Sequence, residues 1–165
     1  MTAQNEQQIL DQILHGYSRK EDKALLCHAF SVAQKMHEGQ KRASGEAYIF
    51  HPLHTALTLS QLHLDPPTVA AGLLHDVVED TPYGEENLKK EFGNEIAFLV
   101  QGVTTLGKLK YRGEERHAEN LRKMLLAMAS DIRVILIKFA DRLHNMQTLQ
   151  ALAPEKQKRI ALETL

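Results

Sequence analysis

The sequence predicts an all-α protein that folds as a single domain. Apolar residues recur at helical spacing along most of the chain, whereas hairpin signals and internal repeats are missing from the sequence. Capping residues and prolines mark several helix starts. A chain of 165 residues is long enough for one domain with a substantial core.

The spacing of apolar residues divides the first half of the chain into helices over 9–14, 18–39, 51–62 and about 67–80. Ser18 and Glu21 form a capping-box pattern that would open the second of these, which we expect to end near Gly39. The single cysteine, Cys27, lies in its apolar run, and we expect a buried structural thiol.

The third and fourth helices have recognisable starts. Pro52 suits the first position of a helix, which would place His51 at the N-cap. Asp65 is expected to cap the central helix, which Pro82 ends because the residue before a proline is driven out of helical geometry.

The second half of the chain is also helical by pattern, and Asp131 marks one clear start. The expected elements are helices over 85–92, 96–103, 116–128, 131–149 and 154–165, with Gly93 ending the first of them and a mobile loop over 106–115.

The central helix carries an unusual group of ionisable residues. Residues 73–81 read Leu-Leu-His-Asp-Val-Val-Glu-Asp-Thr, so His75 lies four residues from Glu79, and Asp76 four from Asp80. Residues at that separation lie on one face of a helix. Neighbouring carboxylates repel one another by roughly 1 kcal/mol or more per pair unless a cation lies among them. We therefore predict a divalent metal ion at this helix.

A second candidate segment lies in the apolar helix near the C-terminus. Asp141, Asn145 and Thr148 are spaced to share one helix face. A carboxylate buried without compensation would cost several kcal/mol, so Asp141 needs a partner. Arg142 is one candidate and a metal ion is the other.

The two segments combine with the upstream His-Pro into one predicted metal site. Its ligands are His51, His75, Asp76 and Asp141. Two imidazoles and two carboxylates suit Mn²⁺, Fe²⁺ or Zn²⁺ better than Ca²⁺, which prefers oxygen alone. Glu79 and Asp80 remain as acid–base or water-positioning groups, because a metal-bound water ionises near neutral pH.

Four strings carry a resemblance to a known family. They are residues 44–52 (Ser-Gly-Glu-Ala-Tyr-Ile-Phe-His-Pro), 73–81, 120–124 (Asn-Leu-Arg-Lys-Met) and 137–146 (Ile-Lys-Phe-Ala-Asp-Arg-Leu-His-Asn-Met). With them the chain resembles the HD superfamily of metal-dependent phosphohydrolases, and more closely the hydrolase domain of the RelA/SpoT alarmone enzymes. The resemblance covers about residues 24–165 and implies one HD-type helical bundle over 1–165, with residues 1–18 as an N-terminal helix.

The resemblance also implies an activity. The family uses Mn²⁺ to remove the 3′-pyrophosphate of (p)ppGpp, giving GDP or GTP and pyrophosphate. By position, the four residues above would bind Mn²⁺, and Glu79 with Asp80 would activate the attacking water. The nucleotide would contact Arg42, Ser44, Asn145 and Thr148. The polar loop around Arg42 suits phosphate contacts, and a solvated turn between helices is its alternative.

Two positions depart from the family pattern. Ala43 replaces a usual second basic residue and Ala47 a usual proline, which puts the affinity for the substrate in doubt rather than the chemistry. Two other functions therefore stay open. One is an HD phosphohydrolase that acts on another phosphorylated nucleotide cofactor, and the other is a module that binds the alarmone without cleaving it.

Composition narrows the partners and the compartment. A net charge of −1 gives no basic field for nucleic-acid binding. The sequence has no apolar run of the roughly 20 residues that a membrane span needs, and residues 1–6 do not start like a signal peptide. We expect a cytoplasmic protein with a small-molecule partner. The helical character at Leu165 favours a fragment or shortened protein over a stand-alone hydrolase.

Overall fold

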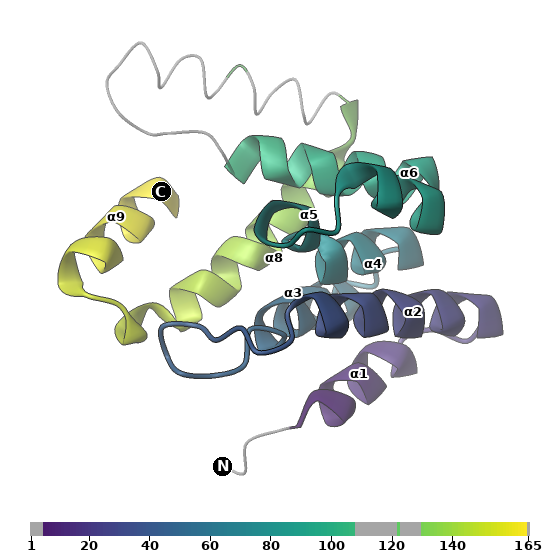
Figure 1. Ribbon diagram of the computed structural model, residues 1–165, viewed down its shortest axis with the longest axis horizontal. Helices are drawn as coiled ribbons and strands as arrows, with labels where there is room; N and C mark the ends of the chain where they lie inside the picture. Colours follow the sequence, from purple (N-terminus) through teal and green to yellow (C-terminus); the bar gives the residue numbers. More distant parts are fainter. Residues whose placement is uncertain (1–4, 108–121, 123–129, 165) are drawn as a thin grey trace.

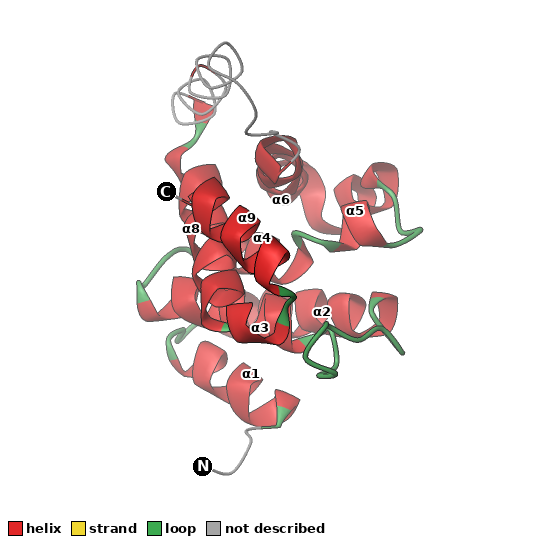
Figure 2. Ribbon diagram, turned by 90° about the vertical axis from the view of Figure 1, so that its left-hand side faces the viewer, coloured by secondary structure: helices red, strands yellow, loops and turns green. Residues whose placement is uncertain are grey.

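The computed structural model describes residues 5–107, 122 and 130–164, and it confirms the predicted all-α fold (Figure 1). The elements are α1 (Glu6–His15), α2 (Lys20–Met36), α3 (Phe50–Gln61), α4 (Pro66–Leu74), α5 (Val77–Asp80), α6 (Glu85–Gly107), α8 (Ile132–Gln147), the 3₁₀ helix η1 (Leu149–Ala151) and α9 (Pro154–Thr164). Figure 2 shows helices joined by short loops and no strand among the residues described. Apart from residue 122, the predicted helix over 116–128 lies outside those residues, and so does most of the predicted loop over 106–115.

Helix α4 lies at the centre and contacts α2, α3, α6 and α8. Every residue from Thr68 to Leu74 is buried. Gly72 permits a close approach to α3, because a Cβ atom at this position would lie 2.5 Å from Cδ1 of Leu59. The central helix is therefore the part of the core on which the other helices are positioned.

Two predicted caps are confirmed and connect helix starts to one another. The Asp65 carboxylate accepts a hydrogen bond from the Thr68 backbone N–H, and Asp131 accepts one from that of Arg133. The Arg133 guanidinium then reaches Asp131 at 2.7 Å, Asp65 at 3.0 Å and Glu95 at 2.7 Å. One arginine thus ties the starts of α4 and α8 to α6.

Several boundaries differ from the prediction. Helix α2 begins at Lys20 with Arg19 as an N-cap that makes no side-chain bond, so Ser18 lies one residue too early to cap it. Helix α3 begins at Phe50, which places His51 inside the first turn rather than at the N-cap. The prediction of a buried thiol is also wrong, because Cys27 lies on the solvent side of α2 and is exposed.

The predicted continuous helix over 67–80 is also wrong, since α4 ends at Leu74 and α5 begins at Val77. In an unbroken helix the N–H of Asp76 would donate to the carbonyl of Gly72. Here Nδ1 of His75 lies 2.8 Å from that carbonyl and donates to it instead. The side chain of His75 thereby competes with the helix at the point where the chain turns.

The predicted break at Gly93 is confirmed, because Gly93 has φ 84° and ψ 175° and two helices meet there at a kink within α6 (Glu85–Gly107). The second of these helices continues to Gly107, past the predicted end at residue 103 and into the start of the predicted loop. None of the helices in the described ranges combines the length and apolar composition needed to cross a bilayer.

Candidate metal centre and adjoining pocket

Side chains from three places in the chain come together in one cluster. His51 comes from the first turn of α3, His75 and Asp76 from the turn between α4 and α5, and Asp141 from the middle of α8. Nε2 of His51 lies 3.2 Å from Oδ1 of Asp141 and 3.5 Å from Oδ2 of Asp76. Nε2 of His75 lies 3.2 Å from Oδ1 of Asp76 and 4.0 Å from Oδ1 of Asp141.

His75 and Asp76 are adjacent in the sequence and meet in one site, at the junction between α4 and α5. The predicted pairs join each of them to a residue four positions on. In the structure, Nε2 of His75 also lies 3.2 Å from Oδ1 of Asp76.

The position of the proton on the His75 ring favours a cation here. Its Nδ1 donates to the Gly72 carbonyl, so the lone pair of the neutral ring lies on Nε2. That atom is buried and has no hydrogen-bond partner. A lone pair that faces carboxylate oxygens is stabilised by a positive ion between them. The ligand-capable atoms of His51, His75 and Asp141 all lie within 4.8 Å of one another, so the residues present fit a divalent metal ion.

The Asp141 carboxylate is held ionised by its neighbours. Burial raises its pKa, but the neighbouring nitrogen groups, the Lys138 ammonium among them, lower it by more, and the net pKa lies well below the usual range. Lys138 Nζ lies 2.7 Å from Oδ2, and Asn145 Nδ2 lies 2.6 Å from Oδ1. The ion-pair partner of this buried carboxylate is therefore Lys138, a partner that the sequence pattern does not predict.

The two residues of the predicted acid–base pair have different surroundings in the structure. The Tyr48 hydroxyl lies 2.9 Å from Oδ2 of Asp76 and 2.9 Å from Oδ2 of Asp80, which ties Asp80 to the metal centre. Glu79 is exposed on α5 and lines a cavity of about 280 Å³ against α6. The structure thus brings Asp80, but not Glu79, into hydrogen-bonded contact with the other site residues.

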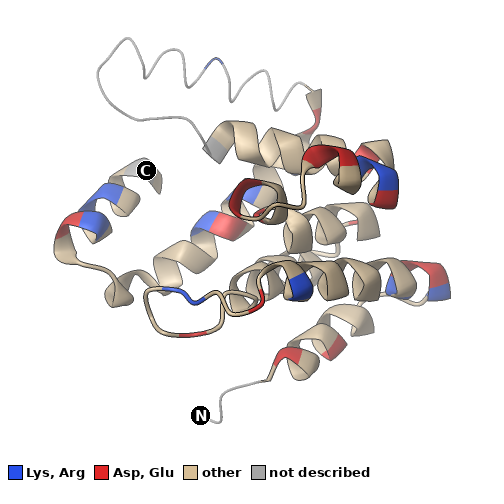
Figure 3. Ribbon diagram, in the orientation of Figure 1, with Lys and Arg blue, Asp and Glu red and all other residues tan. Residues whose placement is uncertain are grey.

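A pocket of about 330 Å³ adjoins the metal centre between the loop before α3, the end of α8, and α9. All four predicted nucleotide contacts line it, namely Arg42, Ser44, Asn145 and Thr148. Its basic lining residues are Lys41, Arg42, Arg142 and Lys156. Figure 3 shows the corresponding basic colouring on the loop, α8 and α9, whereas α5 is acidic. The pocket is suited to an anion.

The loop that carries Arg42 is a short turn rather than an irregular segment. The N–H of Arg42 donates to the carbonyl of Glu46, and that of Gly45 to the carbonyl of Arg42. Arg42 Nη2 then donates to Oδ1 of Asn145 at 2.5 Å, across the pocket. This bond links the loop to α8 beside Asp141.

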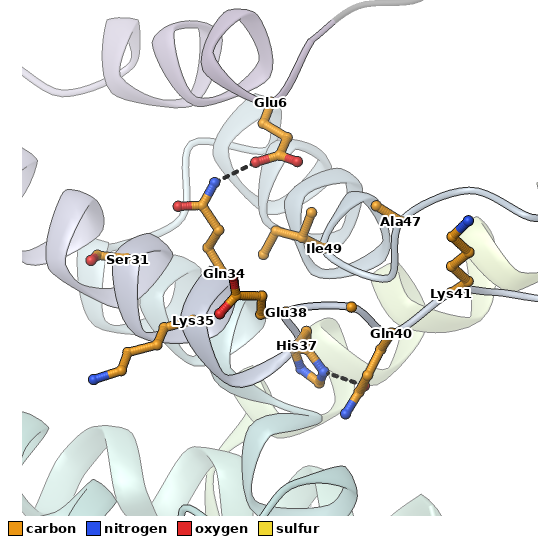
Figure 4. Close-up of a pocket in the computed structure, with 11 residues that line it drawn as sticks. Glu6, Ser31, Gln34, Lys35, His37, Glu38, Gln40, Lys41, Ala47 and Ile49 are labelled. Atoms are coloured by element: carbon orange, nitrogen blue, oxygen red, sulfur yellow. Dashed lines mark hydrogen bonds between the residues drawn. The ribbon is translucent and has the colours of Figure 1, made fainter.

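A second cavity of about 510 Å³ lies between α1, α2 and the same loop (Figure 4). Its lining mixes acidic Glu6 and Glu38 with basic Lys35 and Lys41. None of the residues predicted for the site lines it. Although this cavity is larger than the pocket beside the metal centre, its lining does not connect it to the proposed metal ligands.

Known proteins resemble this chain along most of its length. Residues 29–165 match the HD domain family. A guanosine-3′,5′-bis(diphosphate) 3′-pyrophosphohydrolase of Haemophilus influenzae is 59% identical over 135 residues, which is 81% of this chain and 20% of that protein. The bifunctional (p)ppGpp synthase/hydrolase SpoT of Escherichia coli is 51% identical over 157 residues, or 94% of this chain and 22% of that protein.

The chain thus spans about a fifth of the length of the curated relatives it matches. Another relative, from Streptomyces coelicolor, is a GTP pyrophosphokinase that is 55% identical over 83% of this chain and 16% of its own length. Among solved structures, one described as a metazoan ortholog of SpoT that hydrolyses ppGpp superposes with a TM-score of 0.66 at 27% identity. The superposition covers 90% of this chain and 85% of that one.

Proposed function

The chain belongs to the HD-domain family, and on that premise we propose that it hydrolyses ppGpp and pppGpp at the 3′-diphosphate. The products are GDP or GTP and pyrophosphate. The observation that carries the proposal is that a cluster of two histidines and two aspartates opens beside a pocket lined by four basic residues. Relatives named for this hydrolysis, and a similar structure described as hydrolysing ppGpp, support it. We propose residues 1–165 as one HD hydrolase domain.

The proposed ion is Mn²⁺, and its proposed ligands are His51, His75, Asp76 and Asp141. A mixed set of imidazoles and carboxylates favours a transition metal over Ca²⁺ or Mg²⁺. When bound, a divalent ion supplies Lewis-acid chemistry, since it lowers the pKa of a water and offsets negative charge on a phosphoryl oxygen. The buried Nε2 of His75 supports this assignment, because no protein group bonds to it.

Proton transfer is assigned to the carboxylates of α5. In the proposed step water forms a bond to the phosphorus attached to the 3′-oxygen, and the bond between that phosphorus and the 3′-oxygen breaks. Asp80 takes the proton of the water, and the 3′-oxygen gains a proton as the nucleotide leaves. Glu79 is proposed to assist, although its exposed position on α5 would require it to turn toward the metal centre.

The nucleotide is proposed to occupy the basic pocket. Arg42 offers a planar guanidinium to a phosphate or to the face of a purine. Ser44, Asn145 and Thr148 offer hydrogen bonds to the sugar and the base. Lys41 and Lys156 add positive charge for a ligand that carries two diphosphates.

One observation keeps a second function in view. Ala43, the position that departs from the family pattern, lines this same pocket. The departure therefore lies where it can change which nucleotide is preferred. The second candidate is an HD phosphohydrolase that acts on a nucleotide cofactor with a 2′- or 3′-phosphate.

A pyrophosphate-release assay on the purified chain decides between these functions. The substrates are ppGpp and a 3′-phosphorylated dinucleotide cofactor, each with and without Mn²⁺. We expect Mn²⁺-dependent release of pyrophosphate and GDP from ppGpp. Phosphate release from the cofactor alone would establish the second candidate. Binding of ppGpp without turnover of either compound would indicate a binding module.

A further inference from the structure

His144 lies on α8 between the metal centre and the basic pocket, and the proposed chemistry gives it no part. Its side chain is 6% exposed. Its Nδ1 lies 2.8 Å from Nδ1 of His51 and 2.9 Å from Nη1 of Arg42. Its ring also stacks on His54, with centroids 4.9 Å apart and 12° between the planes. One buried nitrogen therefore contacts both a proposed ligand and a residue of the pocket.

These two contacts assign the protons on the rings. A guanidinium has N–H donors and no acceptor, so Nδ1 of His144 must accept the bond from Arg42. His51 can then bond to the same atom only if its own Nδ1 carries a proton. A neutral His51 of this tautomer has its lone pair on Nε2, the atom that faces Asp141 and Asp76.

We propose that His144 is a positioning residue that holds His51 in the tautomer able to bind the metal and connects Arg42 to the metal centre through the same nitrogen. The inference rests on the metal site of the proposed function but not on the identity of the nucleotide. A His51 with its proton on Nε2 would donate to Asp141 and could not act as a ligand. A hydrogen bond to the ring nitrogen that does not bind the metal orients a metal-binding histidine in this way.

The link to Arg42 has a consequence for the two sites. Arg42 and His51 both donate to Nδ1 of His144, so each of the two hydrogen bonds weakens the other. When a phosphate engages Arg42, the acceptor becomes available to His51 alone. We therefore expect the metal and the occupant of the pocket to strengthen each other's binding, since coupling between sites is reciprocal.

The tautomers can be measured on the unmodified chain. Long-range ¹H–¹⁵N correlation spectra distinguish a protonated ring nitrogen from one with a lone pair, and single His→Asn variants assign the signals. We expect His51 to carry its proton on Nδ1 and His144 on Nε2 without metal. A His51 protonated on Nε2 would overturn the inference.

Metal affinity supplies the second test, with Mn²⁺ alone titrated into the metal-free chain. His144→Leu removes the acceptor, whereas His144→Asn places an amide oxygen near the position of Nδ1. We expect the leucine variant to weaken Mn²⁺ binding about 10–100-fold and the asparagine variant to stay within about threefold of the parent. His15→Leu, at an exposed histidine of α1, is the matched control and should not change the affinity.

A double-mutant cycle tests the connection to Arg42. Arg42→Leu should tighten Mn²⁺ binding in the parent by more than it does in the His144→Leu background, with a difference of about two- to tenfold. Equal effects in both backgrounds would overturn the connection. Equal Mn²⁺ affinity of the parent and His144→Leu would overturn the positioning role alone, while a parent chain that binds no Mn²⁺ would overturn the proposed metal site and this inference together.

Discussion

The Tyr48 hydroxyl lies between two carboxylates with different proposed roles. It has one proton, and Asp76 and Asp80 both place an oxygen 2.9 Å from it. Burial raises the pKa of this tyrosine, and the two carboxylates raise it further, so the hydroxyl keeps its proton. Tyr48 therefore links a proposed metal ligand to the proposed base and fixes the distance between them.

Removing that hydroxyl tests the link. Tyr48→Phe should lower kcat about tenfold or more, because Asp80 loses its connection to Asp76. The ring should stay in place, since it stacks on His37 with centroids 4.5 Å apart. Steady-state kinetics with ppGpp would measure the effect. The control is Tyr17→Phe, which loses a bond to the Leu64 carbonyl and should leave kcat unchanged. An unaltered kcat in Tyr48→Phe would exclude the role.

The metal ligands and the proton acceptor can be separated by a pair of substitutions. Asp76→Ala should abolish both Mn²⁺ binding and turnover, because an oxygen ligand is lost. Asp80→Asn should keep Mn²⁺ bound and lose turnover, because an amide cannot take a proton from water. Metal content after dialysis and the pyrophosphate assay together read both properties. Normal Mn²⁺ occupancy in Asp76→Ala would contradict the ligand assignment, and a fully active Asp80→Asn the assignment of the base.

At the scale of the helices, the sequence predicts the features that depend on residues close together in the chain. Asp65 and Asp131 cap α4 and α8 as predicted, because an N-cap bond reaches only two or three residues along the chain. The break at residues 75–76 was missed because apolar spacing does not register a side chain that takes a backbone acceptor. Tyr48 and His144 belong to recognisable strings, but their partners lie far away in the sequence, so periodicity could assign them no role.

The cap of α8 yields a stability prediction with a defined pH dependence. Asp131→Ala should cost about 1–2 kcal/mol of unfolding free energy at pH 7, because the cap and the Arg133 contacts are both lost. The hydrogen bond from Arg133 lowers the pKa of Asp131 from its usual 3.8. A lowered pKa means that the ionised group stabilises the folded chain above about pH 4, and that this contribution disappears as pH falls further.

Urea unfolding at pH 7 and pH 2.5 measures this contribution. Asp131→Asn keeps a capping oxygen and loses only the charge, so it serves as the matched variant. The parent should exceed Asp131→Asn in stability at pH 7, and the difference should shrink at pH 2.5. A difference that grows toward acid would show that the sign is wrong.

The kink in α6 predicts a strict requirement for glycine. Gly93 has φ 84° and ψ 175°, a region open to glycine and closed to residues with a Cβ atom. Gly93→Ala should therefore destabilise the chain by about 1–3 kcal/mol. Lys90→Ala, at an exposed position of the same helix, should stay within about 0.5 kcal/mol of the parent. Equal stability of the two variants in thermal unfolding would refute the strain.

At the scale of the whole molecule, the proposed metal joins three parts of the core. Its ligands come from α3, from the turn after α4, and from α8, and these helices contact one another. An ion that binds the folded chain alone stabilises it by about 2.7 kcal/mol when its free concentration is one hundred times Kd. We expect Mn²⁺ to raise the Tm of the chelator-treated chain.

The variant that tests this stabilisation is Asp141→Asn. It removes a charged ligand but keeps a side chain of the same shape, so the rise in Tm with Mn²⁺ should be lost. Its own Tm without metal is the reference, because the Lys138 contact is also weakened. An equal rise in the variant and the parent would place the ion elsewhere.

The origin of Asp141 on α8 also orders events during folding. His51, His75 and Asp76 lie within one neighbouring pair of helices, so a short loop closure suffices to gather them. Asp141 joins only after α8, which follows much later in the chain, has docked on α3 and α4. A nascent chain that has emerged only as far as α6 therefore holds an incomplete set of donors. Tight binding of the ion would then report that the chain has finished folding.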